Sequence, residues 1–85
     1  MSIKSIYKKI KGNPKNVSFE DIHKLMIAGG FEHRNSKSSH NVYTHPDLEG
    51  IDNYVTIPFN RPVKTVYIKK AIEKFDLANP DFDKE

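Results

Sequence analysis

The sequence predicts a single α+β domain in which helices cover one face of a three-stranded antiparallel sheet. Apolar residues recur at helical spacing near both ends of the chain, and they alternate with a period of two through residues 31–59. The length of 85 residues suits one small domain with a modest core. The expected order is α-α-β-β-β-α in two layers, and the second face of the sheet is left to water or to a ligand.

Two helices are expected before the sheet. The first has one apolar face, which is formed by Ile3, Ile6, Tyr7 and Ile10. Gly12 and Pro14 then end this helix.

The second helix has a well-defined start. Ser18 is able to cap its first amides in a Ser-x-x-acid pattern with Asp21. Val17 and Ile22 have the spacing of a hydrophobic staple. The glycine pair at residues 29–30 ends the helix. Its apolar stripe consists of Phe19, Ile22, Leu25 and Met26.

Three strands and a final helix follow. The strands are expected at residues 31–35, 40–45 and 53–59, with "KSS" as a tight turn and "PDLEGID" as a loop. Pro46 stops the second strand because proline cannot donate to the ladder. One face of the third strand holds Val55, Ile57 and Phe59. Thr65 is expected to cap the last helix, whose apolar face is Ile68, Ala71, Ile72 and Phe75.

The composition excludes several classes of protein. The chain has no cysteine, which removes disulfides, thiolate chemistry and the common zinc motifs, and which suits a reducing cytoplasm. No run approaches the roughly 18 apolar residues of a membrane span. The start "MSIKSIYKKIKGN" lacks the apolar region of a secretory signal. We therefore expect a cytoplasmic protein without a membrane partner.

The charge is distributed unevenly. Residues 76–85 contain four acids and one base out of 11 acids and 14 bases, so residues 1–75 keep 13 bases and 7 acids, a net charge of +6. A basic body with a short acidic tail favours a polyanionic partner. The alternative is that the lysines are ordinary solubilising surface residues.

An ordered set of short motifs resembles one family. "SH" heads the second strand, "VYTHP" runs along it, "TIPF" lies in the third strand and "PVK" precedes the last helix. This set resembles the HicA family, the small toxins of bacterial toxin–antitoxin pairs. The likeness runs from Ile3 to Phe75, and "NPKNVSFEDIHKLMIAGGFEHR" is similar to the front half of one branch of that family.

The resemblance implies a fold akin to the double-stranded RNA-binding domain with an extra N-terminal helix. On this basis residues 1–76 form the domain and residues 77–85 a short acidic tail. It also implies an endoribonuclease that acts on messenger RNA. A metal-independent reaction without a cofactor is expected, because no two acids sit together in the sequence in the way that a two-ion site requires. A HicB-type antitoxin would inhibit the enzyme, and the complex with this antitoxin would allow an oligomer.

The family's catalytic histidine follows a Gly-Ser pair, and the matching residue is His40. Ser38 stands where the family usually has glycine, which permits a positive φ at low cost. Either this turn is built differently, with Asn35 in the left-handed position, or the alignment of the site is shifted.

The chemistry of RNA cleavage is compatible with a single histidine. RNA supplies its own nucleophile, the 2′-OH, so cleavage needs a base, an acid and positive charge near the phosphate. A histidine with a pKa near 6.5 serves either proton role. A structural alternative exists, because His40 shares strand parity with Val42 and Thr44 and would then line the rim of the core. The Ser-His context and the family resemblance favour catalysis.

Further residues are predicted to contact RNA. Lys37 and Ser39 adjoin His40 in the sequence, and they are able to supply a charge and a hydrogen bond. Tyr43 either stacks on a base or packs in the sheet. Lys64 stands at the start of the last helix, where the helix dipole favours phosphate, although a solvated lysine is the alternative. The last helix has a basic face consisting of Lys69, Lys70 and Lys74.

The other histidines are not expected in the site. His45 lies on the opposite strand face from His40, so the two do not share a ligand and zinc is not expected. His23 and His33 are predicted to be surface or packing residues.

Three functions remain open on the sequence alone. The first is the ribonuclease toxin. The second is a non-catalytic double-stranded RNA or nucleic-acid-binding module, which Ser38 and the lack of a second obvious catalytic group favour. The third is a protein-binding domain whose basic surface meets an acidic partner.

Overall fold

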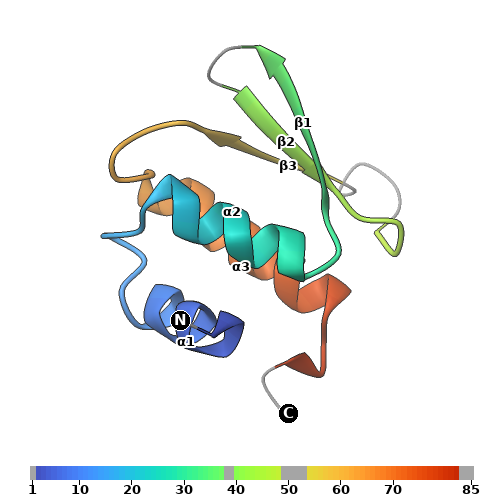
Figure 1. The fold of residues 1–85 in the computed structure, drawn as a ribbon, viewed down its shortest axis with the longest axis horizontal. Coiled ribbons are helices and arrows are strands. Elements are labelled where there is room, and N and C mark those ends of the chain that lie inside the picture. The colour runs from blue at the N-terminus through green and yellow to red at the C-terminus, as the bar shows by residue number, and fades with distance from the viewer. Residues whose placement is uncertain (1, 38–39, 49–53, 83–85) are drawn as a thin grey trace.

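The computed structural model describes residues 2–37, 40–48 and 54–82. It confirms the α+β class and the predicted order of elements. All helices lie on one side of the sheet (Figure 1). The helices are α1 (Ile3–Gly12), α2 (Phe19–Ala28) and α3 (Thr65–Ala78). The strands are β1 (Glu32–Lys37), β2 (His40–Thr44) and β3 (Tyr54–Pro58), which pair antiparallel in the order β1-β2-β3.

The predicted start and end of α2 are confirmed. The Ser18 hydroxyl accepts a hydrogen bond from the Asp21 backbone N–H at 3.2 Å. At the other end, Gly30 adopts a φ of +90°, a value that favours glycine. This turn lets the Phe31 N–H donate to the Met26 carbonyl at 3.1 Å. The chain therefore leaves α2 directly into β1.

The last helix begins one residue earlier than predicted. Thr65 is the first helical residue rather than the cap, and the N-cap is Lys64, whose side chain makes no capping bond. The predicted domain boundary between residues 76 and 77 falls inside α3, which continues to Ala78. Phe82 then packs back on the helices, with its ring centroid 5.1 Å from that of Tyr7.

The turn between β1 and β2 is approached through an irregularity in β1. Asn35 pairs with Asn41 and Lys37 pairs with His40, so the register shifts across Ser36. No non-glycine residue in the described part of the chain has a positive φ. The hypothesis that Asn35 takes the left-handed position is therefore wrong. Ser38 and Ser39, which include the residue that departs from the family pattern, lie outside the described residues.

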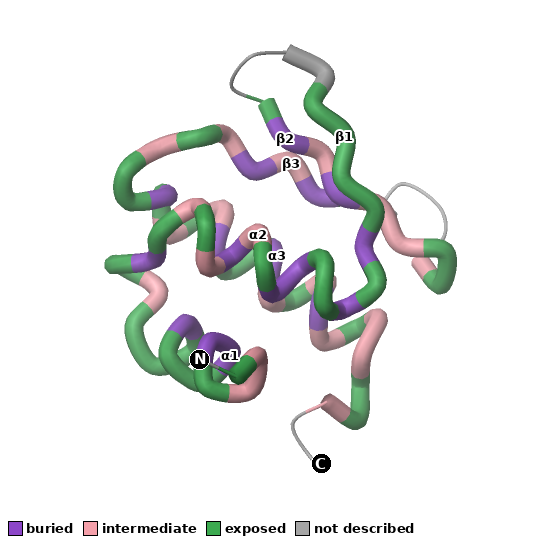
Figure 2. Tube along the Cα trace, viewed as in Figure 1, coloured by how far each residue is buried: buried purple, intermediate pink, exposed green. Residues whose placement is uncertain are grey.

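The sheet has one buried face and one open face. Residues of β2 and β3 alternate between exposed or half-buried and buried positions, as Figure 2 shows along the trace. Tyr43 and Ile57 point into the core with no exposed surface. His40 has the opposite parity and is exposed. The alternative that His40 lines the rim of the core is therefore wrong.

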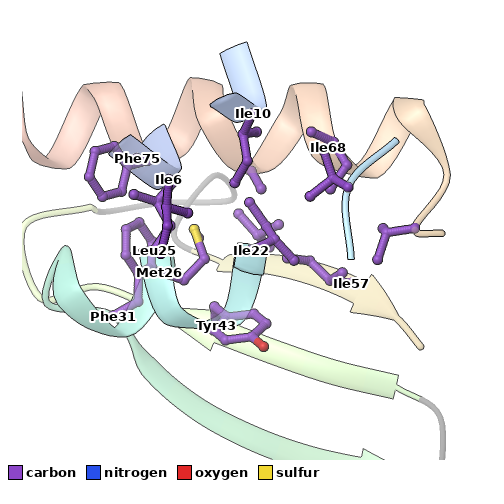
Figure 3. Close-up of a cluster of buried hydrophobic side chains, with 14 of the residues drawn as sticks. Ile6, Ile10, Ile22, Leu25, Met26, Phe31, Tyr43, Ile57, Ile68 and Phe75 are labelled. Carbon is purple, nitrogen blue, oxygen red and sulfur yellow. The ribbon is translucent and has the colours of Figure 1, made fainter. Parts of the chain in front are cut away.

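The core lies between the sheet and the pair α2 and α3, and it continues between this pair and α1 (Figure 1). Figure 3 shows buried side chains of α2 and α3 together with Tyr43 and Ile57 of the sheet. Helix α1 lies on the side of α2 and α3 that faces away from the sheet (Figure 1). The Tyr7 hydroxyl joins α1 to α3 by donating to Asp76 Oδ1 at 2.6 Å.

None of the helices within residues 2–37, 40–48 and 54–82 has the length and apolar character needed to cross a membrane.

Candidate active site on the open face of the sheet

The backbone of His40 is fixed from both sides. His40 opens β2, the middle strand, and pairs with Lys37 of β1 and with Pro58 of β3. Its side chain is exposed on the face that no described helix covers. A middle strand is the most constrained place in a small sheet, so the imidazole is presented from a rigid support.

Two other histidines are bonded within a polar cluster beside the core. Tyr43 and His23 are joined by a hydrogen bond of 2.7 Å between Oη and Nδ1. Burial raises the pKa of the Tyr43 hydroxyl, so it stays protonated and donates to His23 Nδ1. Burial, and next the charge of His33, lower the pKa of His23. His23 therefore acts as a neutral acceptor that joins α2 to the sheet.

The amide of Asn41 orients His33. Asn41 Nδ2 donates to the Ile57 carbonyl at 3.4 Å, which turns its Oδ1 towards His33 Nε2 at 2.7 Å. Since Oδ1 only accepts, Nε2 carries the proton. Asn41 is buried, and this bonding satisfies its side chain. Both histidines predicted as surface or packing residues thus have structural partners.

His45 is held at the end of β2. The Asp47 N–H donates to His45 Nδ1 at 3.0 Å, so Nε2 carries the proton and donates to the Gly29 carbonyl at 3.1 Å. Asn79 Nδ2 donates to the same carbonyl at 3.0 Å. Both ring nitrogens of His45 are therefore occupied. Together these bonds connect the C-terminal end of α2 to the sheet and to the end of α3.

His40 is the exception among the four histidines. Its imidazole has no hydrogen-bond partner and no ring contact within the part of the chain that the structure describes. An exposed histidine without a structural bond has both nitrogens available for proton transfer. This availability separates His40 from the other three.

Arg34 shares the open face with His40, and the sequence analysis missed it. Arg34 pairs with Val42, which has the same strand parity as His40, and directly opposite residues share a face. Diagonal neighbours lie within reach of long side chains, so an Arg34 guanidinium is able to meet a phosphate at His40. The register that brings them together depends on the irregularity at Ser36, for which the sequence gives no local sign.

The residues predicted to bind RNA near His40 have different positions. Lys37 is directly opposite His40 in the ladder. Ser39 lies outside the described residues. Tyr43 is fully buried, so it has no surface that RNA could contact. The alternative that Tyr43 packs in the sheet is therefore confirmed.

The predicted basic face of α3 is divided between two surfaces. Lys64 is exposed at the start of α3, in the helical layer. Lys69 borders a groove next to Ile10 of α1, whereas Lys70 borders a groove next to Tyr54 of β3. These lysines do not form a single continuous surface with His40.

The open face combines one proton-transfer group with positive charge. Its only acid within the described strands is Glu32, which pairs with Thr44 at the end of the sheet opposite His40. Within the described residues, no group of three histidine, cysteine or acidic side chains is placed to hold a metal ion. The arrangement suits cleavage of a phosphodiester that brings its own nucleophile.

Comparison with known proteins gives no family. No protein-family model, curated protein or solved structure matches the chain. The functional assignment therefore depends on the residues and on their geometry.

Proposed function

We propose that the chain is a HicA-type toxin, a metal-independent endoribonuclease that cleaves messenger RNA with His40 and is inhibited by a HicB-type antitoxin. One observation carries the proposal. The histidine that the motif "SH" singles out is also the histidine whose imidazole is exposed and unbonded within the described residues. The α-β-β-β-α order after α1 supports the further proposal that the fold is akin to the double-stranded RNA-binding domain.

The proposed reaction uses the 2′-OH of RNA as nucleophile. The 2′ oxygen attacks the adjacent phosphorus, and the bond from phosphorus to the 5′ oxygen breaks. His40 either accepts the 2′ proton as base or donates a proton to the departing 5′ oxygen as acid. Arg34 and Lys37 are the cations nearest in register, and they would stabilise the charge on the phosphate.

A single positioned histidine contributes a rate enhancement of roughly 10²–10⁴. The enzyme is therefore expected to be slow, which suffices when its effect is growth arrest rather than metabolic flux.

The second candidate is a nucleic-acid-binding module without catalysis. It is favoured by the separation of Glu32 from His40 along the sheet, which leaves His40 without a second proton-transfer side chain among the described strands. Both candidates use the same face, so cleavage itself must distinguish them.

The deciding experiment compares His40→Ala with Thr44→Ala. Both residues lie on β2 with the same parity, at opposite ends of the strand. Each substitution at such a position should lower the free energy of unfolding by about 1 kcal/mol or less, so both variants should fold. We expect His40→Ala to abolish growth arrest and RNA cleavage while RNA binding and antitoxin binding persist, and Thr44→Ala to retain all of them.

Growth and messenger RNA integrity should be followed together during expression without antitoxin, and folding checked by circular dichroism. A folded His40→Ala protein that still degrades messenger RNA would refute the assignment of His40. Binding of RNA without cleavage by the wild type would favour the binding module.

A further inference from the structure

A groove of about 460 Å³ runs along the outer edge of β3, away from His40. It lies between β3 and α3, whereas His40 is on the open face near Pro58. The residues that line it are Tyr54, Val55, Thr56, Tyr67, Lys70, Glu73 and Lys74. None of them takes part in the proposed cleavage, so any ligand of this groove would have a separate function.

The outer edge of β3 is also an edge of the sheet. Within the described residues β3 pairs with β2 only, which leaves one row of its backbone N–H and C=O groups without a strand partner. Proteins usually protect such edges with charged side chains, prolines or bulges, because an exposed edge pairs readily with another chain.

The opposite edge of the same sheet has charges and a bulge, whereas the protection of β3 is limited to Pro58 at its end. Strand β1 carries Glu32, Arg34 and Lys37 and an irregularity across Ser36. Strand β3 has the sequence "YVTIP", which contains no charge and consists mainly of residues that favour strands. Its first residue, Tyr54, is 52% exposed. Among the described residues, the weaker protection of β3 makes this edge the better candidate for pairing with another chain.

The α3 side of the groove adds positive charge. Lys70 is exposed and makes no ion pair within the described residues. Lys74 lies one helical turn further along the same wall, and Glu73 is the single acid among the described residues that line the groove. In an added strand, alternate side chains would point towards α3, so an acid at one of these alternate positions would meet Lys70.

We propose that an extended acidic segment of a partner protein binds along β3 as a fourth strand of the sheet, with alternate carboxylates facing Lys70. Main-chain hydrogen bonds would supply affinity, and Lys70 would select acidic residues. This proposal is independent of His40 and of RNA cleavage. A nucleic-acid strand would also meet the lysines, but it would not use the row of backbone groups on β3, and so the peptide fits more of the observed surface.

The test uses the heptapeptide acetyl-Glu-Val-Glu-Val-Glu-Val-Glu-amide and the full-length protein labelled with ¹⁵N. We expect the amide resonances of Tyr54, Val55, Thr56 and Ile57 to shift on titration. Lys70→Glu should weaken binding by about five- to tenfold, because it replaces an attraction with a repulsion. Lys24→Glu makes the same charge change at an exposed position of α2 outside the groove, and it should leave affinity nearly unchanged.

Two backbone-modified peptides test strand pairing directly. One is N-methylated at every valine and the other at every inner glutamate, so each lacks one alternate row of N–H donors. In a strand only one of these rows points at β3, so one peptide should lose binding and the other should keep it. Equal binding of both, or no binding of the parent peptide, would overturn the proposal. An oligouridylate that shifts the same amides and displaces the peptide would assign the groove to nucleic acid instead.

Discussion

At the scale of single residues, the Tyr43–His23 hydrogen bond makes stability depend on pH. Burial, and next the charge of His33, lower the pKa of His23 below its ordinary value of 6.5. Between the lowered pKa and 6.5 the unfolded chain therefore binds more protons at this position than the folded chain. Stability from this group is fully present above about pH 6.5 and is lost as the pH falls through the folded pKa.

We expect His23→Asn to remove this dependence. Asparagine retains an acceptor near the position of Nδ1 for the Tyr43 hydroxyl, but it does not titrate. Because the acceptor is retained, the melting temperatures of the wild type and the variant should be closest near about pH 8, and the wild type should fall increasingly below the variant towards about pH 5. Thermal unfolding followed by circular dichroism checks this, and a difference that is constant across the range would exclude His23 as the source.

The assignment of residues to faces shows what the sequence could decide. Alternation along β2 placed His40 and Tyr43 on opposite faces, which the structure confirms. It did not identify the buried face, because Val42 and Tyr43 are both apolar and lie on different faces. Which face of β2 is buried depends on β3, where Val55 and Ile57 face the helices. These two residues are in register with Tyr43 and Asn41 of β2. Register between strands is a long-range property, and so the bonds of Tyr43 to His23 were not predictable from local pattern.

At the scale of elements, the close approach of α2 and α3 depends on Gly29. A Cβ placed on Gly29 would collide with the Phe75 ring and would come within 2.9 Å of Asn79 Nδ2. A Cβ on Gly12, the last residue of α1, would meet nothing within 4 Å. The same substitution should therefore have opposite effects at the two positions.

We expect Gly29→Ala to destabilise the domain by about 1–3 kcal/mol through overpacking. Gly12→Ala should be neutral or should stabilise it by up to about 1 kcal/mol, since alanine favours the helix. Urea unfolding of both variants measures the two values. A Gly29→Ala protein as stable as the wild type would mean that α2 and α3 separate easily.

The two helix starts show why one cap was predictable and the other was not. Ser18 caps α2 through a local bond to Asp21, and a local pattern is sufficient to predict it. The chain enters α3 differently, because the buried Val63 donates its N–H to the Val17 carbonyl at 3.0 Å. This distant contact fixes the backbone before Thr65, so the cap position falls on Lys64. A capping rule based on neighbouring residues cannot include such a contact.

At the scale of the whole molecule, the predicted basic face of α3 is interrupted by the way the helix packs. Consecutive helical residues are rotated by about 100° relative to each other. Lys69 therefore faces the α1 side, and Lys70 faces β3. The net charge was readable from the sequence, but its division among surfaces requires the packing of α3 against two neighbours.

This division leads to a prediction about RNA affinity and salt. If RNA binds the open face, Arg34→Ala combined with Lys37→Ala should reduce the slope of log affinity against log salt by roughly 1.4–1.8, because about two counterions fewer are released. Lys69→Ala combined with Lys70→Ala removes the same charge from other surfaces and should leave the slope unchanged. Filter binding of a short RNA across a salt series gives both slopes. The reverse result would place RNA on α3 instead.

The bond between Tyr7 and Asp76 joins residues that are separated by almost the whole described chain. Lys11 strengthens it by donating to the same hydroxyl at 3.1 Å. During translation α1 emerges before α3, yet the surface on which it packs includes α3. The nascent chain therefore cannot close the core of this domain on the ribosome until α3 has been made. Until then α2 covers the apolar side of α1 without the help of α3, and the domain cannot reach its complete fold.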